Sequence, residues 1–384
     1  MKAASAACRL EKYETGGSKM RGKLLASTAL VAASAASTGA RAEDPVKLEI
    51  SGYYISAAGV NFSDNENIRD LARPYVFKQD VEVHFDGSTT LDNGLTVGVH
   101  VELEGQTSED QIDQVYAYFS GGWGQVFFGD TSEALAQMCY LSPDGANGIF
   151  GADSPWFNFS NAAVVGGYAG TNGTCFGLDD NSTKIVYFSP TFGGFSFAAS
   201  FAPDGTEDTR NTTNGAGTRF NNNPGQFSEI VSVAANFNHD FNGVTFIMGG
   251  GGTWSMDREA DLNGVNDASD YNGYVQVSYA GFTFGGATEW RYNFGSEGQD
   301  ARIFSTGVSY GIDAWTFGLG WSHGDYEMGV GTDNLDVFAL TTGYPLGPGV
   351  TLAGVIEFDD YDSDSPASES DASFSFGLGT EIDF

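Results

Sequence analysis

Histidine is the residue type in this chain best suited to acid–base or metal chemistry, and four occur in the 384 residues. His84 and His100 lie in neighbouring segments of alternating apolar and polar residues, separated by a short turn. Paired across that turn, both imidazoles would face one side of a sheet, where they could titrate near neutral pH or bind a metal. Two histidines without further ligands are more often plain polar lining, so we predict no metal site. His323 falls on the apolar parity of its own segment, so a Ser/His/Asp hydrolase is not indicated.

Carboxylates are collected in one long segment, residues 131–182, which contains no basic residue. Long connections are usually functional or disordered. Facing cations across a narrow passage, such acids would create a transverse field that orients polar solutes and selects them by charge. The candidate acids of the segment are Glu133, Asp144, Asp153, Asp179 and Asp180. The candidate charges of the facing wall are Lys47, Lys78, Lys184, Arg291, Glu102, Glu289 and Glu357. For each of these, an ordinary solvated charge remains the alternative.

The same segment holds two cysteines, Cys139 and Cys175. In an oxidising, exported environment they could form a disulfide. On the chain-entropy view, closing a loop of this size would stabilise the fold by roughly 3–4 kcal/mol. Two free thiols in a loop are the alternative that the sequence leaves open.

The N-terminal residues predict export. From Met20 the chain reads Met-Arg-Gly-Lys, followed by an apolar run from Leu24 to about Ala36 and by Ala40-Arg41-Ala42, which is the pattern of a cleaved signal peptide. We therefore expect residues 1–42 to be removed, Met20 to be the true start, and residues 43–384 to form one mature domain. Ten basic and 48 acidic residues remain in that domain, a net charge of −38. Such a charge excludes nucleic acid as a partner and favours cations.

Strict alternation of apolar and polar residues runs through the mature chain and predicts β-strands. Leu95–Leu103 is one example, since apolar residues occupy every odd position and polar or small residues the even ones. Sixteen segments read in this way, and most have the length that a tilted strand needs to cross a bilayer. They are residues 46–60, 76–88, 94–104, 111–120, 124–130, 183–189, 194–203, 228–239, 243–255, 271–280, 281–294, 301–310, 314–325, 335–344, 349–360 and 372–384.

The connections between these segments sort by length. Short links rich in Gly, Asn, Asp and Pro, such as 240–242 and 280–281, alternate with long polar links, such as 204–227 and 326–334. An up-and-down membrane barrel requires short turns on one side and long loops on the other. A soluble β-sandwich, or an exported adhesin, has no reason to sort its connections by parity.

These patterns predict an all-β fold, a transmembrane antiparallel up-and-down barrel of about sixteen strands. Lipid offers no hydrogen-bond partners to the backbone, so a sheet in a membrane must close on itself. The apolar residues of each strand then face lipid and the polar ones face the interior. Side chains cannot fill the interior of a barrel of this size, which leaves an aqueous channel.

Three stretches resemble the Gram-negative general porins, and the resemblance extends over residues 46–384. The stretches are Leu91–Glu102, Ala117–Gly129 and Asp180–Phe195, and the terminal Phe384 matches the aromatic end of that class. The resemblance implies a sixteen-stranded barrel, a homotrimer, and a third long loop that folds into the lumen as a constriction. Here that loop would be about residues 131–182.

We interpret the chain as an outer-membrane pore for passive diffusion of small hydrophilic solutes and ions, with a preference for cations and no catalytic cofactor. A substrate-selective channel is the alternative, indicated by the inward tyrosines Tyr53, Tyr116, Tyr118 and Tyr274. The acidic stretches 257–270 and 359–371 could bind Ca²⁺ weakly or bridge to lipopolysaccharide through divalent ions. A solvated, repulsive surface is the plainer interpretation of both.

Overall fold

A computed structural model shows how these segments assemble. It describes residues 46–106, 111–153, 156–161, 172–205, 227–256, 267–294, 298–328, 331–364 and 368–384. The predicted signal peptide, residues 1–42, lies outside the described residues.

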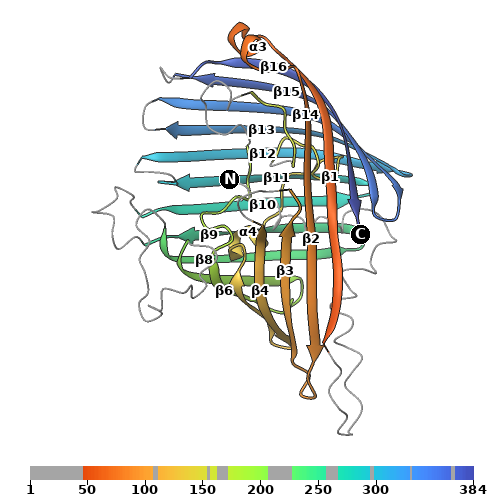
Figure 1. The fold of residues 1–384 in the computed structure, drawn as a ribbon, viewed down its shortest axis with the longest axis vertical. Coiled ribbons are helices and arrows are strands. Elements are labelled where there is room, and N and C mark those ends of the chain that lie inside the picture. Colours follow the sequence, from red (N-terminus) through yellow and green to blue (C-terminus); the bar gives the residue numbers. More distant parts are fainter. Residues whose placement is uncertain are drawn as a thin grey trace.

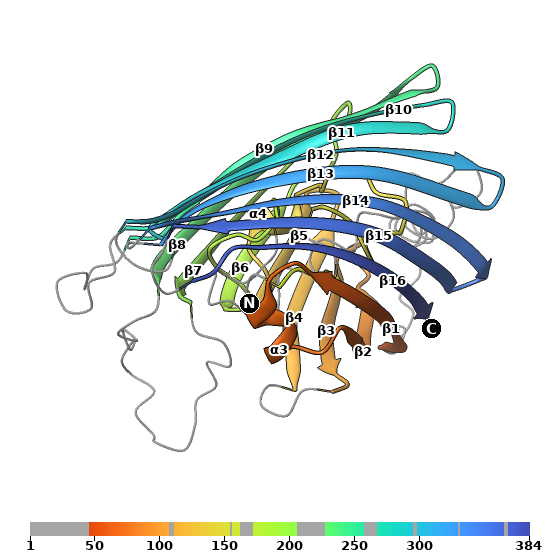
Figure 2. The same cartoon turned by 90° about the horizontal axis from the view of Figure 1, so that it is seen from above.

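Sixteen antiparallel strands form one closed barrel, in which each strand pairs with its sequence neighbours and β1 pairs with β16 (Figures 1 and 2). The predicted fold class is therefore confirmed. The strands are β1 (Lys47–Ser63), β2 (Tyr75–Thr90), β3 (Thr96–Glu104), β4 (Ile112–Gly121), β5 (Gly124–Asp130), β6 (Thr183–Phe188), β7 (Phe195–Asp204), β8 (Ser228–Phe241), β9 (Val244–Trp254), β10 (Ser269–Tyr279), β11 (Phe282–Tyr292), β12 (Gln299–Ile312), β13 (Trp315–Met328), β14 (Thr332–Gly347), β15 (Val350–Ser363) and β16 (Asp371–Asp383).

Several strands run past their predicted ends. Strand β14 begins before the predicted residue 335, because Asp333 and Asn334 still pair with Ser363 and Asp362 of β15. These polar residues continue the hydrogen-bonded ladder beyond the apolar band. Alternation of apolar residues marks only the part of a strand that faces lipid, so it underestimates strand length here.

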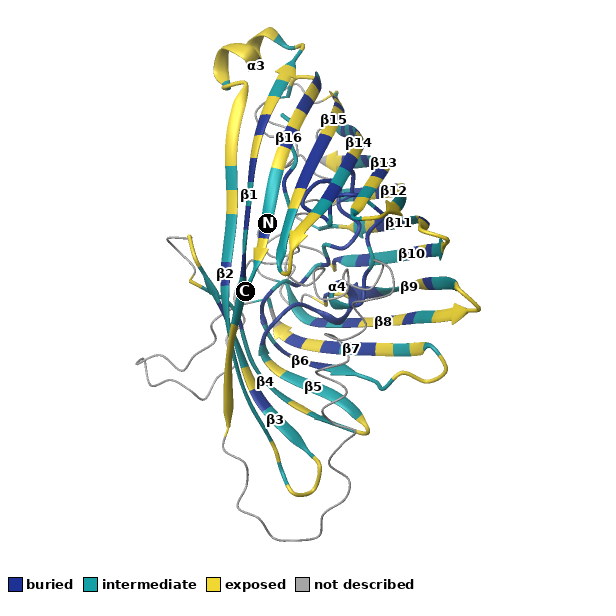
Figure 3. Cartoon of the chain, turned by 90° about the vertical axis from the view of Figure 1, so that its right-hand side faces the viewer, coloured by how far each residue is buried: buried dark blue, intermediate teal, exposed yellow. Residues whose placement is uncertain are grey.

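The two faces of the wall differ as the alternation predicts. On β14, Phe338 and Leu340 are exposed, whereas the alternating residues Val337, Ala339 and Thr341 are buried. Figure 3 shows the same yellow and dark blue banding along β15 and β16. The exposed apolar side chains form the outer surface, and barrel closure leaves no unpaired strand edge.

Short turns and two short helices connect some of the strands. Asn242-Gly243 and Ala280-Gly281 have positive φ at both residues, as a two-residue hairpin turn of the primed type requires. Helix α3 (Glu66–Leu71) follows β1, and helix α4 (Ala134–Gln137) follows β5. Within the described residues, neither helix has the length and apolarity to cross a membrane.

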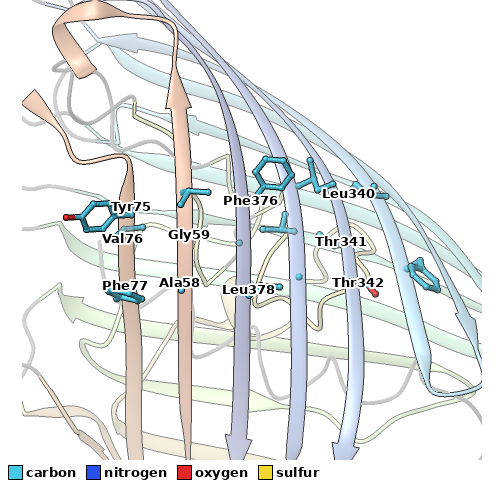
Figure 4. Close-up of a pocket in the computed structure, with 16 residues that line it drawn as sticks. Ala58, Gly59, Tyr75, Val76, Phe77, Leu340, Thr341, Thr342, Phe376 and Leu378 are labelled. Carbon is cyan, nitrogen blue, oxygen red and sulfur yellow. The ribbon is translucent and has the colours of Figure 1, made fainter. Parts of the chain in front are cut away.

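An apolar hollow of about 700 Å³ lies on the outer surface, across strands β2, β1, β16, β15, β14 and β13. Figure 4 shows Tyr75, Phe77, Phe376 and Leu340 around it. Small residues such as Ala58 and Gly354 create the depression between these larger side chains. Because its lining is apolar and faces outward, the hollow is not part of the channel.

Candidate pore-lining site

The described parts of the 131–182 segment contact the inward side chains of the wall. The segment first reaches β7 and β8 through helix α4, whose two first backbone N–H groups donate to serine hydroxyls. Ala134 N donates to Ser200 Oγ at 3.1 Å, and Leu135 N donates to Ser232 Oγ at 2.9 Å. These serines satisfy donors that the start of a helix leaves without an intrahelical partner.

Glycines of the wall let the next part of the segment lie against the strand backbone. A Cβ atom on Gly318 of β13 would stand 2.2 Å from the amide nitrogen of Gly145, and one on Gly307 of β12 would stand 2.1 Å from the Pro143 carbonyl. Only glycine allows backbones to approach this closely. The Gly145 amide donates to Thr341 Oγ1 at 2.7 Å. These glycines were missed from the sequence, although glycine at the inward parity of successive strands is a signal for close backbone contact.

The following part of the segment packs on an apolar patch inside the barrel. Ile149, Phe150 and Phe159 are buried in a cluster with inward side chains of β1 and β15, among them Ile55 and Val355. Alternation predicted polar inward residues, so this patch is an exception to the predicted pattern. The apolar wall residues are stable there because the segment covers them.

Five of the seven candidate wall charges bond to the backbone of the segment. The lysine and arginine side chains donate to its carbonyls, and two glutamates accept from its amides. The cation pairs are Lys78 with Asn158, Arg291 with Gly177, and Lys184 with both Thr131 and Asp180. The glutamate pairs are Glu289 with Phe176 at 3.1 Å and Glu357 with Phe159 at 2.8 Å. Lys47 lies apart, exposed near the start of β1, and Glu102 lies beside the histidines of β2 and β3.

The candidate acids of the segment mostly bond within the segment itself. Asp153 accepts from the Ser142 and Thr174 amides, and Asp144 accepts from two amides of the turn that follows it. Asp179 forms an ion pair with Lys184, N to O 3.3 Å, and the Asp180 carbonyl accepts from the same lysine. These groups hold the shape of the segment.

Cys139 and Cys175 are joined by a disulfide, with the two Cα atoms 5.7 Å apart. The bond links the part of the segment near α4 to the part that returns to β6. Both cysteines are buried beside Leu141 and the wall residues Ile247 and Tyr274.

Strands β2 to β5 form a different sector of the inner wall. Inward side chains such as His84, Asp86, Tyr116 and Tyr118 are half-buried, whereas inward residues of β8 to β15, for example Ser232, Glu289, Ser305, Ser322 and Glu357, are fully buried. Figure 3 shows this contrast as teal on β4 and β5. We call the inner faces of β2–β5 the open sector. Its half-buried side chains are those that contact water in the lumen.

Aromatic rings form a row across the open sector. Tyr53 of β1 lies next to His84, followed by His100, Tyr116 and Phe127, with ring centroids 5.9, 5.5, 5.0 and 4.5 Å apart in turn. Tyr274, the fourth candidate tyrosine, lies elsewhere, because its hydroxyl donates to the Met138 carbonyl under the segment. His323 lies on the outer face between Asp325 and Asp336.

Comparison with known protein families gives a match over most of the chain. A family model described as Gram-negative porin matches residues 26–364. The chain belongs to the Gram-negative porin family. It is therefore an outer-membrane channel protein that crosses the membrane many times. No curated protein sequence matches this porin.

Solved structures share the barrel of this porin. An anion-selective porin from Comamonas acidovorans has 14% identity and a TM-score of 0.56, covering 88% of this chain and 100% of its own. OmpT of Vibrio cholerae in a trimer form has 13% identity and a TM-score of 0.55, covering 89% and 100%. DcaP, an outer-membrane channel of Acinetobacter baumannii, has 11% identity and a TM-score of 0.55, covering 90% and 100%. At these identities the likeness concerns the fold alone.

Of the acidic stretches considered for Ca²⁺, residues 257–266 and 365–367 lie outside the described residues. The other acids belong to this porin's strands or their ends. Asp270 lies in β10, Asp359 in β15 and Asp371 in β16, and all three are buried on the inward side.

Glu133 gives this porin a predicted pH dependence. Its carboxylate accepts from Thr253 Oγ1 at 2.8 Å and from the Leu178 and Asp179 amides. Burial raises the pKa of Glu133 well above its usual range, and the nearby carboxylates of Asp179 and Asp270 add to the increase. The folded protein thus keeps a proton that the unfolded chain releases above about pH 4.3. The free energy of unfolding therefore falls as pH rises from the pKa of Glu133 in the unfolded chain toward its higher pKa in the folded protein.

We expect Glu133→Gln, which mimics the protonated acid, to remove this fall. The free energy of unfolding of the variant should exceed that of the wild type by an amount that grows as pH rises above about 4.3. Denaturant unfolding in detergent measures it. Glu66→Gln in α3 is the control, since that side chain is 90% exposed. Parallel pH profiles for Glu133→Gln and the wild type would contradict the expectation.

Proposed function

We propose that this porin is a passive, water-filled pore for small hydrophilic solutes and ions, and that it prefers cations. The open sector supports the proposal, because half-buried polar side chains in the middle of an inner wall need water beside them. We further propose that segment 131–182 narrows the lumen. Its bonds to Arg291, Glu289 and Glu357 hold it along the wall outside the open sector, and its bond to Lys78 reaches the first part of β2.

The charges of the open sector support cation preference. Strands β3, β4 and β5 contain no lysine or arginine. Carboxylates occupy the inward side of the sector, and they are Glu82, Asp86, Glu102 and Glu104. Lys78, a basic residue of β2, is directed to the segment. Carboxylates outnumber the basic groups of the sector, and a water path with an excess of one charge concentrates ions of the opposite sign.

The barrel itself does not decide the sign of selectivity. The Comamonas acidovorans protein of the same fold is named an anion-selective porin. The preference must therefore come from the side chains on the water path, and in this chain those are acidic.

Reversal potential under a KCl gradient tests the proposal. For the wild type in a planar bilayer, we expect a reversal potential shifted toward the equilibrium potential of K⁺. The double variant Asp86→Asn/Glu104→Gln should move the reversal potential toward zero, because two lumen charges are lost. Glu327→Gln is the matched control, since that acid lies on the outward parity of β13 and is exposed. A wild-type reversal potential shifted toward the equilibrium potential of Cl⁻ would reject cation preference. Equal shifts for both variants would reject the role of Asp86 and Glu104 in it.

The aromatic row favours a second candidate, a substrate-selective channel. Stacked rings on the water path could bind flat or sugar-like solutes through their faces. Saturable block of the current by such a solute would support this candidate over a general pore. Large single-channel current steps that such a solute does not block would support the general pore.

We also propose a homotrimer, as the trimer form of Vibrio cholerae OmpT suggests. The outer apolar hollow of Figure 4 offers a surface for lipid or for a neighbouring subunit. Lipopolysaccharide remains a proposed partner of the acidic stretches 257–270 and 359–371, through bridging divalent ions.

A further inference from the structure

The histidines of β2 and β3 lie close together, as the sequence predicted, but the carboxylates around them were not predicted. His84 stands opposite Glu102 in the β-ladder, and His100 stands opposite Asp86. One ligand atom each from His84, His100 and Glu102 lie within 4.8 Å of one another. Glu82, two residues before His84, places Oε2 at 2.8 Å from His84 Nε2. The strand register thus adds carboxylates to the histidine pair.

The two hydrogen bonds of His100 need one more donor than a neutral imidazole between two carboxylates provides. Its Nδ1 lies 2.7 Å from Asp86 Oδ1, and its Nε2 lies 2.8 Å from Glu102 Oε1. A neutral imidazole has one N–H donor, so it cannot donate to both carboxylates at once. Either a second proton or a metal ion must therefore lie between these groups. Glu102 Oε2 is buried without a hydrogen-bond partner among the described residues, so this carboxylate has unused ligand capacity.

We propose that His84, His100 and Glu102 bind a divalent first-row transition-metal ion, such as Zn²⁺, on the inner wall of the open sector. Two imidazole nitrogens and one carboxylate oxygen are three ligands that Zn²⁺ accepts in tetrahedral geometry, with water in the fourth position. Ligands bonded at about 2.0–2.2 Å to such an ion stand about 3.3 Å apart. Small side-chain rotations must therefore separate His100 Nε2 from Glu102 Oε1, which are 2.8 Å apart, and bring the more distant ligand atoms closer.

Neighbouring groups already have the arrangement of an outer ligand shell. Asp86 on Nδ1 of His100 leaves Nε2 of that ring to the metal, which is the carboxylate–histidine–metal pattern. Tyr53 Oη donates to Glu82 Oε1 at 2.5 Å and leaves Oε2 directed at His84. Because the His84 and Asp86 side chains are 22% and 36% exposed, ions in the lumen can reach the site.

Metal titration of the full-length protein, refolded in detergent and freed of metal with a chelator, tests the site. Co²⁺ is followed by the visible absorption of its bound form, and Zn²⁺ by competition against Co²⁺. We expect one Co²⁺ per chain. His100→Gln and His84→Gln should each raise the Kd at least about 10-fold, and Asp86→Asn about 10- to 100-fold.

His323→Gln is the matched control. His323 also lies between two carboxylates, Asp325 at 3.2 Å and Asp336 at 3.1 Å, but on the outer face and without a second imidazole. The Kd of the His323→Gln variant for Co²⁺ should equal that of the wild type. Glu102→Gln provides a second ligand variant if a histidine variant does not fold, which circular dichroism checks. Absence of bound Co²⁺ in the wild type, or equal Kd values for the wild type and the folded ligand variants, would overturn the site. Because the titration involves no current, its result is independent of the proposed cation preference.

Discussion

Replacing Arg291 with methionine should lower the free energy of unfolding by about 3–5 kcal/mol. Its Nε lies 3.5 Å from Asp270 Oδ2 and 3.4 Å from Glu289 Oε1, and both carboxylates are fully buried. Methionine would leave these two buried carboxyl groups without their counter-ion. It would also remove the hydrogen bond from Nη2 to the Gly177 carbonyl, 2.9 Å, which holds the returning part of the segment. Denaturant unfolding in detergent, followed by tryptophan fluorescence, measures the loss.

Arg302→Met is the matched control for this change. Arg302 lies one strand away on the outer face, its side chain is 57% exposed, and its ion pair with Glu327 is 3.9 Å long. Exposed pairs contribute about 0–1 kcal/mol, so the control should change little. Adding Asp270→Asn and Glu289→Gln to Arg291→Met should recover much of the loss, because the uncompensated charges disappear. Equal losses for the two arginine variants would contradict a stabilising role of the buried ion pairs.

The barrel could be predicted from the sequence because the membrane imposes a simple rule on every strand. Apolar residues must face lipid, so alternation marks the strand, and the parity of connection lengths orders the strands. The predicted segments 124–130 and 183–189 agree with β5 and β6 to within one residue. The closeness of His84 and His100 was also predictable, since a short turn sets the register of the β2–β3 hairpin.

The individual contacts of the 131–182 segment with the wall could not be predicted, because many of them are to backbone groups. Lys184 and Arg291 read as lumen charges in the sequence, and both bond to carbonyls of the segment. A sequence contains no pattern for a carbonyl that lies opposite a given lysine. The inward glycines, such as Gly318, carry a weak signal of the same kind, which indicates a close approach and does not identify the approaching segment.

A stronger signal was present in the strands beneath the segment. Val337–Leu340 on β14 is apolar at four successive positions, and Ala353–Ile356 on β15 is apolar except for one glycine. A strand that is apolar on both faces is covered on both faces. One face of these strands meets lipid, so the other face must meet protein. Such runs in a barrel of this size predict where a loop lies against the inner wall.

Phe150→Ala tests this covering contact, and we expect it to cost about 3–5 kcal/mol. Phe150 is fully buried, with its ring centroid 5.9 Å from that of Phe159 and its side chain in the cluster with Ile55 and Val355. Removing the ring leaves a cavity between the segment and the wall, and water in the lumen gains access to apolar side chains. The midpoint of denaturant unfolding and the rate of proteolysis within residues 131–182 measure the effect.

Phe284→Ala is the control that separates this contact from the general effect of removing a phenylalanine. Phe284 lies on the outer face of β11 and is 56% exposed, so its truncation leaves no internal cavity and should cost on the order of 1 kcal/mol. Faster proteolysis of the segment is expected only for Phe150→Ala, because only that variant weakens the contact with the wall. If both variants lost the same stability and neither sped up proteolysis, the apolar inner patch would be stable without its cover. The polar bonds to the wall, such as those from Arg291, Lys184 and Lys78, would then be what holds the segment.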